Sequence, residues 1–544
     1  METSIRPHSK QLTAEFIAVA ALTALAALLR LPAITEFPPG LHGDEAWLGI
    51  EARRILAEGW IGFWTSAGWG QPTGVFYWTA LAFSVLPDNV AVLRGSVAVL
   101  GALTVPALYL FVRSFFGWRA AMIAAGLLAV SYWHIHYSRT AFTLIAAPLV
   151  ECVVLALLAR GVQTRQGWLF FAAGLATGLG VYTYRGYLFF VVLLGVAWLF
   201  LLLRRPHAER PYPPRLLLSH AALFALPAAI AALPMAVFIA TNYSTYMAYG
   251  GISTVFGSPW LADALQEHHP VTLAAYKLAR ALGIYYVGRE RDVTDGLGEV
   301  SLLDPVTMLL FTTGVVLCLW RWRDWRHTVL IGGIALGAIA VAMTVFWGEN
   351  RRGITALPMV FAAAGLGGDA ILTWLLRLGG RFGLPQAVRL GALPAVAALA
   401  LASAAVWNAW HYFGHIGNSE DTYYTYSGQL TEAAHFLASL DGNPHVYFYA
   451  DRWPWRYESR RFQAPGIDGE DRSHQFGVFR LDRQPEHERV AYLLMPPYHR
   501  YLDEIQERYP GGEVVQRMDG DEVVFVLYLL EDEYAMPERL DNDV

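Results

Sequence analysis

The sequence predicts a polytopic α-helical membrane protein that carries a small soluble α/β domain at its C-terminus. The 544 residues are 55% hydrophobic and only 16% charged, with a mean hydropathy of +0.35. A soluble protein carries about 25% charged residues, so the composition indicates a membrane protein. Long apolar runs recur as far as about residue 411, whereas the chain beyond that point is mostly polar.

The charge divides at the same point. Residues 412–544 hold 12 Arg against 25 Asp and Glu, a net charge of −13. Residues 1–411 hold 28 basic and 20 acidic residues, a net charge of +8. We therefore divide the chain into a basic transmembrane domain, 1–411, and an acidic soluble domain, 412–544. The two cysteines lie in apolar runs, so they predict neither a disulfide framework nor a zinc site.

Eleven apolar segments are predicted as membrane helices, because a span needs about 20 residues in the bilayer core. The first is interpreted as a retained span rather than a cleaved signal peptide. The segments are 14–34, 91–112, 119–133, 143–160, 168–183, 187–203, 216–240, 305–320, 328–347, 354–376 and 391–411.

The connections between these segments alternate in charge. Short basic connections such as "RWRDWRH" are placed in the cytoplasm with the N-terminus by the positive-inside rule. The loops 35–90 and 241–304 and the acidic tail then lie outside, which predicts a multi-pass protein of the plasma (inner) membrane with an extracytoplasmic C-terminal domain. This topology requires that the short apolar segment Gly74–Leu86 does not cross the bilayer.

The first outer loop contains "HGDEAWLGIEARRILAEG", in which His42, Asp44 and Glu45 lie close together. Asp44 fits the N-cap of a surface helix that runs to about Glu58 and stops at Gly59. On this interpretation both carboxylates serve only the helix terminus. Alternatively, one of them performs chemistry at the membrane surface, and the spacing alone does not decide between the two.

Several outer segments resemble a known family in their order along the chain. "HGDEAWLGIEARRILAEG" resembles the acidic first outer loop of GT-C membrane glycosyltransferases, and "GQPTGVFYWTALAFSVL" resembles the surface helix that follows it. "HIHYSRTAF" resembles their second outer loop, and "RGITALP" the start of a late span. Over about residues 14–411 the chain is most similar to the protein O-mannosyltransferases and aminoarabinose transferases of glycosyltransferase family 39.

The resemblance implies an inverting glycosyltransferase that moves a sugar from a polyprenyl-phosphate donor to an acceptor hydroxyl on the outer face of the membrane. The acceptor is then a protein, a glycan or a lipid, and no nucleic acid is expected as a partner. Such chemistry needs a carboxylate as general base. The resemblance indicates Asp44 for this role, with Glu45 as the alternative base or as an orienting partner.

The leaving phosphate needs cations that stabilise its charge. The chain has only two lysines, so arginines are expected to supply most of these contacts. An interfacial aromatic belt or a solvated turn would account for the same residues without any phosphate. The outer-facing candidates are Arg139, Arg185, Arg289, Arg351 and Arg352.

The chain departs from the family pattern at one place. Many relatives carry an aspartate just after the Ser-Arg pair of the second outer loop, where this chain has Thr143 and Leu144. A divalent metal held between two carboxylates is therefore doubtful, and no cofactor is predicted. The next acid is Glu151, which lies inside a predicted span and is either functional or a helix-packing residue.

Further candidates are His42, His136 and Lys277. His134 and His136 alternate as on a strand or turn, and hydrogen bonding is the simpler role for them. Lys277 is expected on the polar side of an amphipathic helix in the loop 241–304.

The acidic tail predicts alternating strands and helices, with strands at "HVYFYA", "VAYLLM" and "EVVFVLYLL". Two other classes fit a polytopic chain. A transporter or flippase of lipid-linked sugars would show internal repeats, and none is visible. A receptor or scaffold would need no carboxylate in the first loop.

Overall fold

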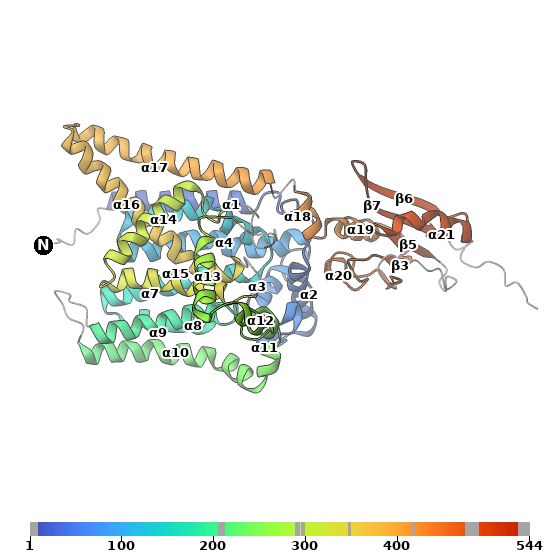
Figure 1. The fold of residues 1–544 in the computed structure, drawn as a ribbon, viewed down its shortest axis with the longest axis horizontal. Helices are drawn as coiled ribbons and strands as arrows, with labels where there is room; N and C mark the ends of the chain where they lie inside the picture. The colour runs from blue at the N-terminus through green and yellow to red at the C-terminus, as the bar shows by residue number, and fades with distance from the viewer. Residues whose placement is uncertain are drawn as a thin grey trace, which may run out of the picture.

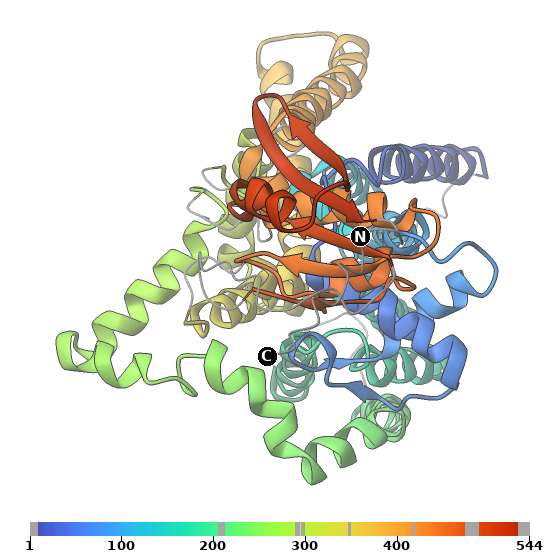
Figure 2. The same ribbon diagram turned by 90° about the vertical axis from the view of Figure 1, so that its right-hand side faces the viewer.

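The structure, a computed structural model, describes residues 9–204, 213–288, 294, 300–345, 350–415, 419–473 and 489–530. It consists of a body of roughly parallel helices and a small sheet domain that lies beyond one end of the body (Figure 1). We call this end the sheet end. Figure 2 looks onto it, and shows the segment from α11 to α13, in green, extending to one side of the sheet.

In the described part of the chain, eleven apolar helices form the body, and each lies within a few residues of a predicted span. Among the described residues, α1, α4, α7, α10, α15, α16 and α17 are long and apolar enough to cross a membrane, whereas α5, α8, α9 and α14 are apolar but shorter. Their bounds are α1 (Ser9–Arg30), α4 (Val90–Phe116), α5 (Trp118–Val130), α7 (Ala146–Thr164), α8 (Gly167–Gly180), α9 (Tyr187–Arg204), α10 (Pro214–Thr241), α14 (Pro305–Trp320), α15 (Trp325–Ala342), α16 (Leu357–Arg381) and α17 (Gln386–Ala409).

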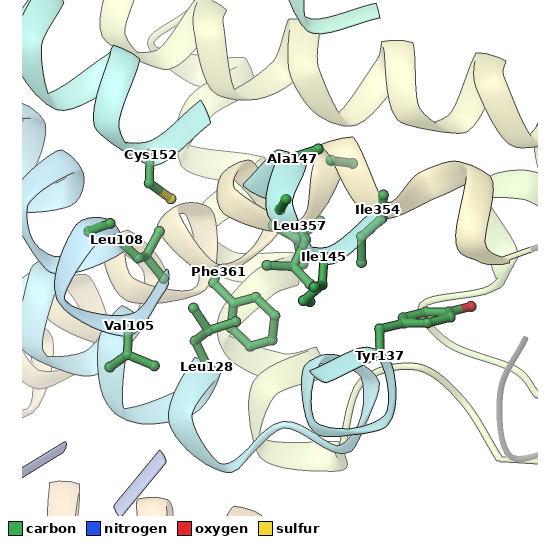
Figure 3. Packing of buried hydrophobic residues seen from close by; sticks show 14 of the residues in the cluster. Val105, Leu108, Leu128, Tyr137, Ile145, Ala147, Cys152, Ile354, Leu357 and Phe361 are labelled. Atoms are coloured by element: carbon green, nitrogen blue, oxygen red, sulfur yellow. The ribbon is translucent and has the colours of Figure 1, made fainter. Parts of the chain in front are cut away.

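The centre of the body is the place where α4, α5, α7 and α16 meet. Leu108 of α4, Leu128 of α5 and Phe361 of α16 are completely buried and lie close together there (Figure 3). Small residues bring α14 and α16 into contact, since a Cβ placed on Gly314 would lie 1.8 Å from the carbonyl oxygen of Ala363. Such close backbone approach is typical of helices packed in membranes.

Short elements cover the sheet end of the body. Helix α2 (Gly43–Glu58) and helix α3 (Gly74–Phe83) follow α1, and between them β1 (Trp64–Thr65) pairs with β2 (Gln71–Pro72). Helix α3 has only ten residues and lies beside α2 at this end (Figure 1). Therefore α1 ends and α4 begins at the same end of the body, as the predicted topology requires.

The second outer loop contains a helix that the sequence did not predict. Helix α6 (Tyr132–Arg139) is buried along its whole length and carries both His134 and His136. The expectation of a strand or turn here was wrong. A helix satisfies the backbone donors and acceptors of a buried segment locally, and burial on all sides removes the polarity pattern that would have indicated it.

The second long outer connection holds three helices, α11 (Tyr243–Ser253), α12 (Trp260–Glu267) and α13 (Pro270–Gly283). The amphipathic helix is confirmed, but Lys277 does not lie on its polar side. Its ammonium group donates a hydrogen bond to the carbonyl of Thr344 at 2.6 Å and lies 4.4 Å from the ring centroid of Trp260. Helix α13 packs against α15, and this contact buries the lysine.

The sheet domain has five strands in the order β4-β3-β5-β7-β6. β3 pairs in parallel with β4 and β5, whereas β7 pairs antiparallel with β5 and β6. The three predicted strands are confirmed. The bounds are α18 (Glu420–Thr425), α19 (Gly428–Ala438), β3 (His445–Tyr449), α20 (Glu458–Gln463), β4 (Gly469–Asp471), β5 (Val490–Leu494), α21 (Leu502–Arg508), β6 (Glu513–Asp519) and β7 (Glu522–Leu530).

The predicted topology can be tested with single cysteines, since both native cysteines are buried. We expect cysteines at Gly59, Asn242 and Ser439 to react with a membrane-impermeant thiol reagent added outside intact cells. A cysteine at Arg323, at the opposite end of α14, should react only after the membrane is opened. Labelling of residues 59 and 439 from opposite sides would contradict the topology.

Candidate active site

Helix α2 carries Asp44 in its first turn, and a histidine caps the helix. His42 is the N-cap, and its Nδ1 accepts a hydrogen bond from the backbone N–H of Asp44 at 3.1 Å. The Glu45 side chain accepts the N–H of His42 at 3.2 Å and completes a capping box. The expectation of Asp44 as the N-cap was therefore wrong by two residues, and the carboxylate of Asp44 is not used for capping. Gly59 ends the helix as predicted, with a φ of 82°.

Glu45 is completely buried in an ion pair with Arg94 of α4. The two carboxylate oxygens accept Arg94 Nε at 2.7 Å and Nη2 at 2.9 Å, and the backbone N–H of Ala141 donates a further hydrogen bond at 2.9 Å. Burial alone would raise the pKa of Glu45, but the charge and hydrogen bonds of Arg94 lower it below the usual carboxyl value. Glu45 is thus held as a charged structural group.

Arg94 also organises the chain between α1 and α2. Its remaining N–H groups donate to the carbonyl oxygens of Ile34 at 3.0 Å, Pro38 at 2.9 Å and Gly40 at 2.7 Å. Arg94 was not predicted as a site residue, because it lies near the start of an apolar run and resembles a charge at the end of a span.

Asp44 faces a cleft at the sheet end of the body. Its carboxylate is one-third exposed and, among the described residues, makes no hydrogen bond; Arg351 Nη1 lies 3.9 Å and His42 Nδ1 lies 4.0 Å away. The cleft has a volume of about 690 Å³, open solvent included. Its lining residues are Asp44, Gly68, Trp69, Gly70, Gln71, Pro72, Phe142, Thr143, Leu144, Tyr184, Arg185, Tyr249, Arg351 and Arg352.

Two arginines of the cleft are fixed by aromatic neighbours. Arg185 donates to the carbonyl of Trp69 at 3.0 Å, and its guanidinium lies 4.6 Å from the ring centroid of Trp64. Arg352 donates to the hydroxyl of Tyr249 at 3.1 Å. Burial lowers the pKa of Arg185, and its Nε is buried without a hydrogen-bond partner among the described residues. A buried donor of this kind is suited to an anion.

An apolar groove adjoins the cleft and shares Tyr184, Arg185, Tyr249 and Arg352 with it. The groove encloses about 1070 Å³, open solvent included, and runs between α9, α11 and α15. Its other lining residues are mostly apolar and include Leu188, Phe189, Val192, Met247, Ala340 and Met343. The arginines therefore lie at the junction of a polar cleft and an apolar groove.

The structure places several predicted residues elsewhere. Arg139 is buried and donates to the carbonyls of Phe37 at 2.9 Å, Pro32 at 2.9 Å and Ala33 at 2.7 Å, so it holds the turn after α1. His136 lies within hydrogen-bonding distance of the carbonyl of Thr294, at 3.1 Å.

Two other predicted residues also lie outside the lining of the cleft. Lys277 is held by Thr344, as described above, and burial together with Arg280 lowers its pKa to about 8. Glu151 is completely buried in α7. Arg289 falls outside the described residues.

The cleft has a neutral side chain where the family resemblance would place a second carboxylate. Thr143 donates a hydrogen bond to Gln71 Oε1 at 2.9 Å, and both line the cleft with Asp44. In the described part of the chain, no three His, Cys, Asp or Glu side chains gather as a metal site. One carboxylate, a hydroxyl and an amide do not fit a divalent ion held between two carboxylates, and we derive no step through a metal.

Neutral substitutions of the two adjacent carboxylates should change stability to very different extents. Glu45→Gln would leave the buried Arg94 without its counter-ion, so the free energy of unfolding should fall by about 3–5 kcal/mol. Asp44→Asn, at a carboxylate without a hydrogen bond, should change it by less than about 1 kcal/mol. Denaturant unfolding in detergent would measure both.

The contribution of Glu45 should also depend on pH. Because the pKa of Glu45 is lowered in the folded state, the stabilisation should be complete above the unfolded value of about 4.3. The stabilisation by Glu45 should be lost as the pH falls through the lowered pKa of the folded state. Equal stability of both variants and the parent at neutral pH would contradict the structural role of Glu45.

Comparison with known proteins supports the architecture. Residues 70–242, about a third of the chain, match the family model of dolichyl-phosphate-mannose-protein mannosyltransferases. No curated protein matches the sequence. Among solved structures, ArnT from Cupriavidus metallidurans in the apo state has a TM-score of 0.55 at 15% identity, covering 97% of this chain and 100% of its own.

Two further structures are similar. ArnT from the same organism bound to undecaprenyl phosphate has a TM-score of 0.54 at 16% identity, covering 96% of this chain and 99% of its own. The apo oligosaccharyltransferase of Archaeoglobus fulgidus has a TM-score of 0.52 at 14% identity, covering 85% of this chain and 65% of its own. The chain is therefore a multi-pass membrane protein with the GT-C fold of membrane glycosyltransferases.

Proposed function

We propose that the chain is an inverting glycosyltransferase that takes a sugar from a polyprenyl-phosphate donor and transfers it to an acceptor hydroxyl. The observation that carries this proposal is the arrangement of one available carboxylate and three arginines around a cleft that continues into an apolar groove. The match to the mannosyltransferase family and the fold shared with ArnT support the same reaction class.

The two cavities suit the two ends of a lipid-linked donor. The polyprenyl chain would lie in the groove formed by residues such as Leu188, Phe189 and Met343. The phosphate would then reach Arg185 and Arg352, which line both cavities. Arginine suits this position because its planar group donates two parallel hydrogen bonds to a phosphate.

Asp44 would act as the general base. Its carboxylate accepts the proton of the acceptor hydroxyl while the oxygen forms a bond to the anomeric carbon of the sugar. The bond from this carbon to the phosphate oxygen breaks, and its electron pair leaves with the polyprenyl phosphate. Arg185, Arg351 and Arg352 would stabilise the charge that develops on the phosphate.

Glu45 would position the base and take no part in proton transfer. Both of its oxygens are engaged by Arg94, and the whole side chain is buried. The sequence left Glu45 either as an alternative base or as an orienting partner, and this geometry favours the role of orienting partner.

The acceptor remains a protein, a glycan or a lipid. We place the reaction on the extracytoplasmic face of the plasma (inner) membrane, because the basic connections assign the sheet end to the outside. The alternative of a transporter or flippase for lipid-linked sugars has no support in the comparisons, which match transferases.

The direct test uses Asp44→Asn in purified protein supplied with a panel of polyprenyl-phosphate sugars and extracted acceptors. General-base catalysis contributes about 10² to 10⁴ in rate, so release of polyprenyl phosphate should fall by that factor. Donor binding should be retained, because the arginines belong to other segments of the chain.

Asp44→Glu provides the matched control, since it keeps a base but moves it by about one carbon–carbon bond. It should retain more activity than the asparagine variant. Full turnover by Asp44→Asn would contradict the role of Asp44, and absence of turnover in the parent with every donor would contradict the proposed function.

A further inference from the structure

The sheet domain contacts the helix that carries Asp44. Helix α20 packs along α2, and Phe462 of α20 is only 1% exposed. Phe462 belongs to the hydrophobic core of the helical body, whereas its neighbours in the sheet domain, such as Trp455 and Ala464, form a separate core. The Phe462 side chain of the sheet domain thus packs against the outer helices α2 and α3, where its ring stacks on that of Phe83 at 6.3 Å between centroids.

Glycines of the first outer loop make room for this contact. A Cβ placed on Gly49 would lie 2.4 Å from Cε2 of Phe462, and one placed on Gly43 would lie 2.8 Å from the hydroxyl oxygen of Tyr457. Glycine is unfavourable inside a helix. Gly49 lies in the middle of α2, and the close approach of the Phe462 ring gives a physical reason for it.

Arg53 of α2 links the helix to two other segments. Its Nη1 donates to the backbone carbonyl of Phe462 at 2.7 Å, and its guanidinium lies 4.1 Å from the centroid of the same ring. Its Nε donates to Asp88 Oδ2 at 2.8 Å, in the turn before α4. The aromatic ring is therefore held between Gly49 on one side and the cation on another.

The chain just before α2 is held by the same domain. The backbone N–H of Leu41 donates to Thr431 Oγ1 of α19 at 3.1 Å. The ring of Tyr426, in the turn between α18 and α19, lies 5.8 Å from the ring of His42, edge to face. The cap of the helix that carries Asp44 is thus in contact with the sheet domain.

We infer that the C-terminal domain acts as a clamp that holds Asp44 in position for proton transfer, with Phe462 and Tyr457 as positioning residues. This inference rests on the proposed role of Asp44. Glu45 and Arg94 hold the first turn of α2, and Phe462 of α20 contacts the helix at Gly49, one turn further along. Arg185, Arg351 and Arg352 belong to other segments, so loosening α2 moves the base relative to a phosphate site that stays in place.

The test compares Phe462→Ala with Phe525→Ala. Both side chains are 1% exposed, and both belong to the sheet domain, but Phe525 lies on β7 in the core of that domain. Both variants should lose stability. A displacement of about 1 Å can cost about 10² in rate, so kcat should fall by about 10- to 100-fold in Phe462→Ala alone, with the KM for the lipid donor unchanged.

Hydrogen exchange gives a readout that needs no activity. In Phe462→Ala the amides of residues 43–58 should exchange at least about ten times faster than in the parent, while those of α4 keep their rate. Unchanged exchange in α2 would overturn the clamp. Faster exchange with unchanged kcat would overturn the positioning role. A parent without turnover would contradict the proposed function, whereas faster exchange in α2 would still support the clamp.

A pair of compensating substitutions distinguishes a positioning role of Phe462 from a loss of activity caused by unfolding. Gly49→Ala places a methyl group against Phe462 without lowering helix propensity, and should lower kcat. Adding Phe462→Leu, which removes the ring edge at that point, should restore at least half of the loss. An equal or larger loss in the double variant, at unchanged folded content, would overturn the inference.

Discussion

The buried ion pair between Glu45 and Arg94 is the constraint on which the arrangement of the outer side depends. A carboxylate and a guanidinium without access to water are tolerated only if their hydrogen bonds are satisfied. Here the pair is satisfied by four segments: the connection after α1, the first turn of α2, the start of α4 and the backbone at Ala141. Each of these segments is therefore fixed relative to the others before any substrate binds.

This constraint places the neighbouring residues Asp44 and Glu45 in different environments. Glu45 is held charged by Arg94 and is enclosed, whereas Asp44 points into the cleft with Arg351 3.9 Å away. Two consecutive residues reach the two environments, because successive side chains of a helix point about 100° apart. The paired carboxylate of Glu45 thus sets the direction of the Asp44 side chain, and Phe462 of the sheet domain packs on the same helix at Gly49, one turn further along.

The membrane helices could be predicted because the bilayer requires long apolar segments whose backbone is bonded internally. Helix α6 could not be predicted in this way, because it is buried on all sides and its sequence therefore shows no alternation of polar and apolar residues at helical spacing. In the site, the family resemblance indicated Asp44, and the predicted topology indicated the outer-facing arginines Arg185, Arg351 and Arg352; all four line the cleft. Arg94, Trp69 and Tyr249 were missed, since their importance comes from contacts with residues far away in the sequence. Arg139 was expected in the cleft, but backbone carbonyls of the turn after α1 surround it.

The most direct measurement is an experimental structure of the protein in a lipid nanodisc with an unreactive polyprenyl phosphonate sugar. The account predicts the phosphonate between Arg185 and Arg352, the polyprenyl chain in the apolar groove and the anomeric carbon facing Asp44. A head group bound away from the cleft, or a cleft in which Asp44 points away from the sugar, would contradict it.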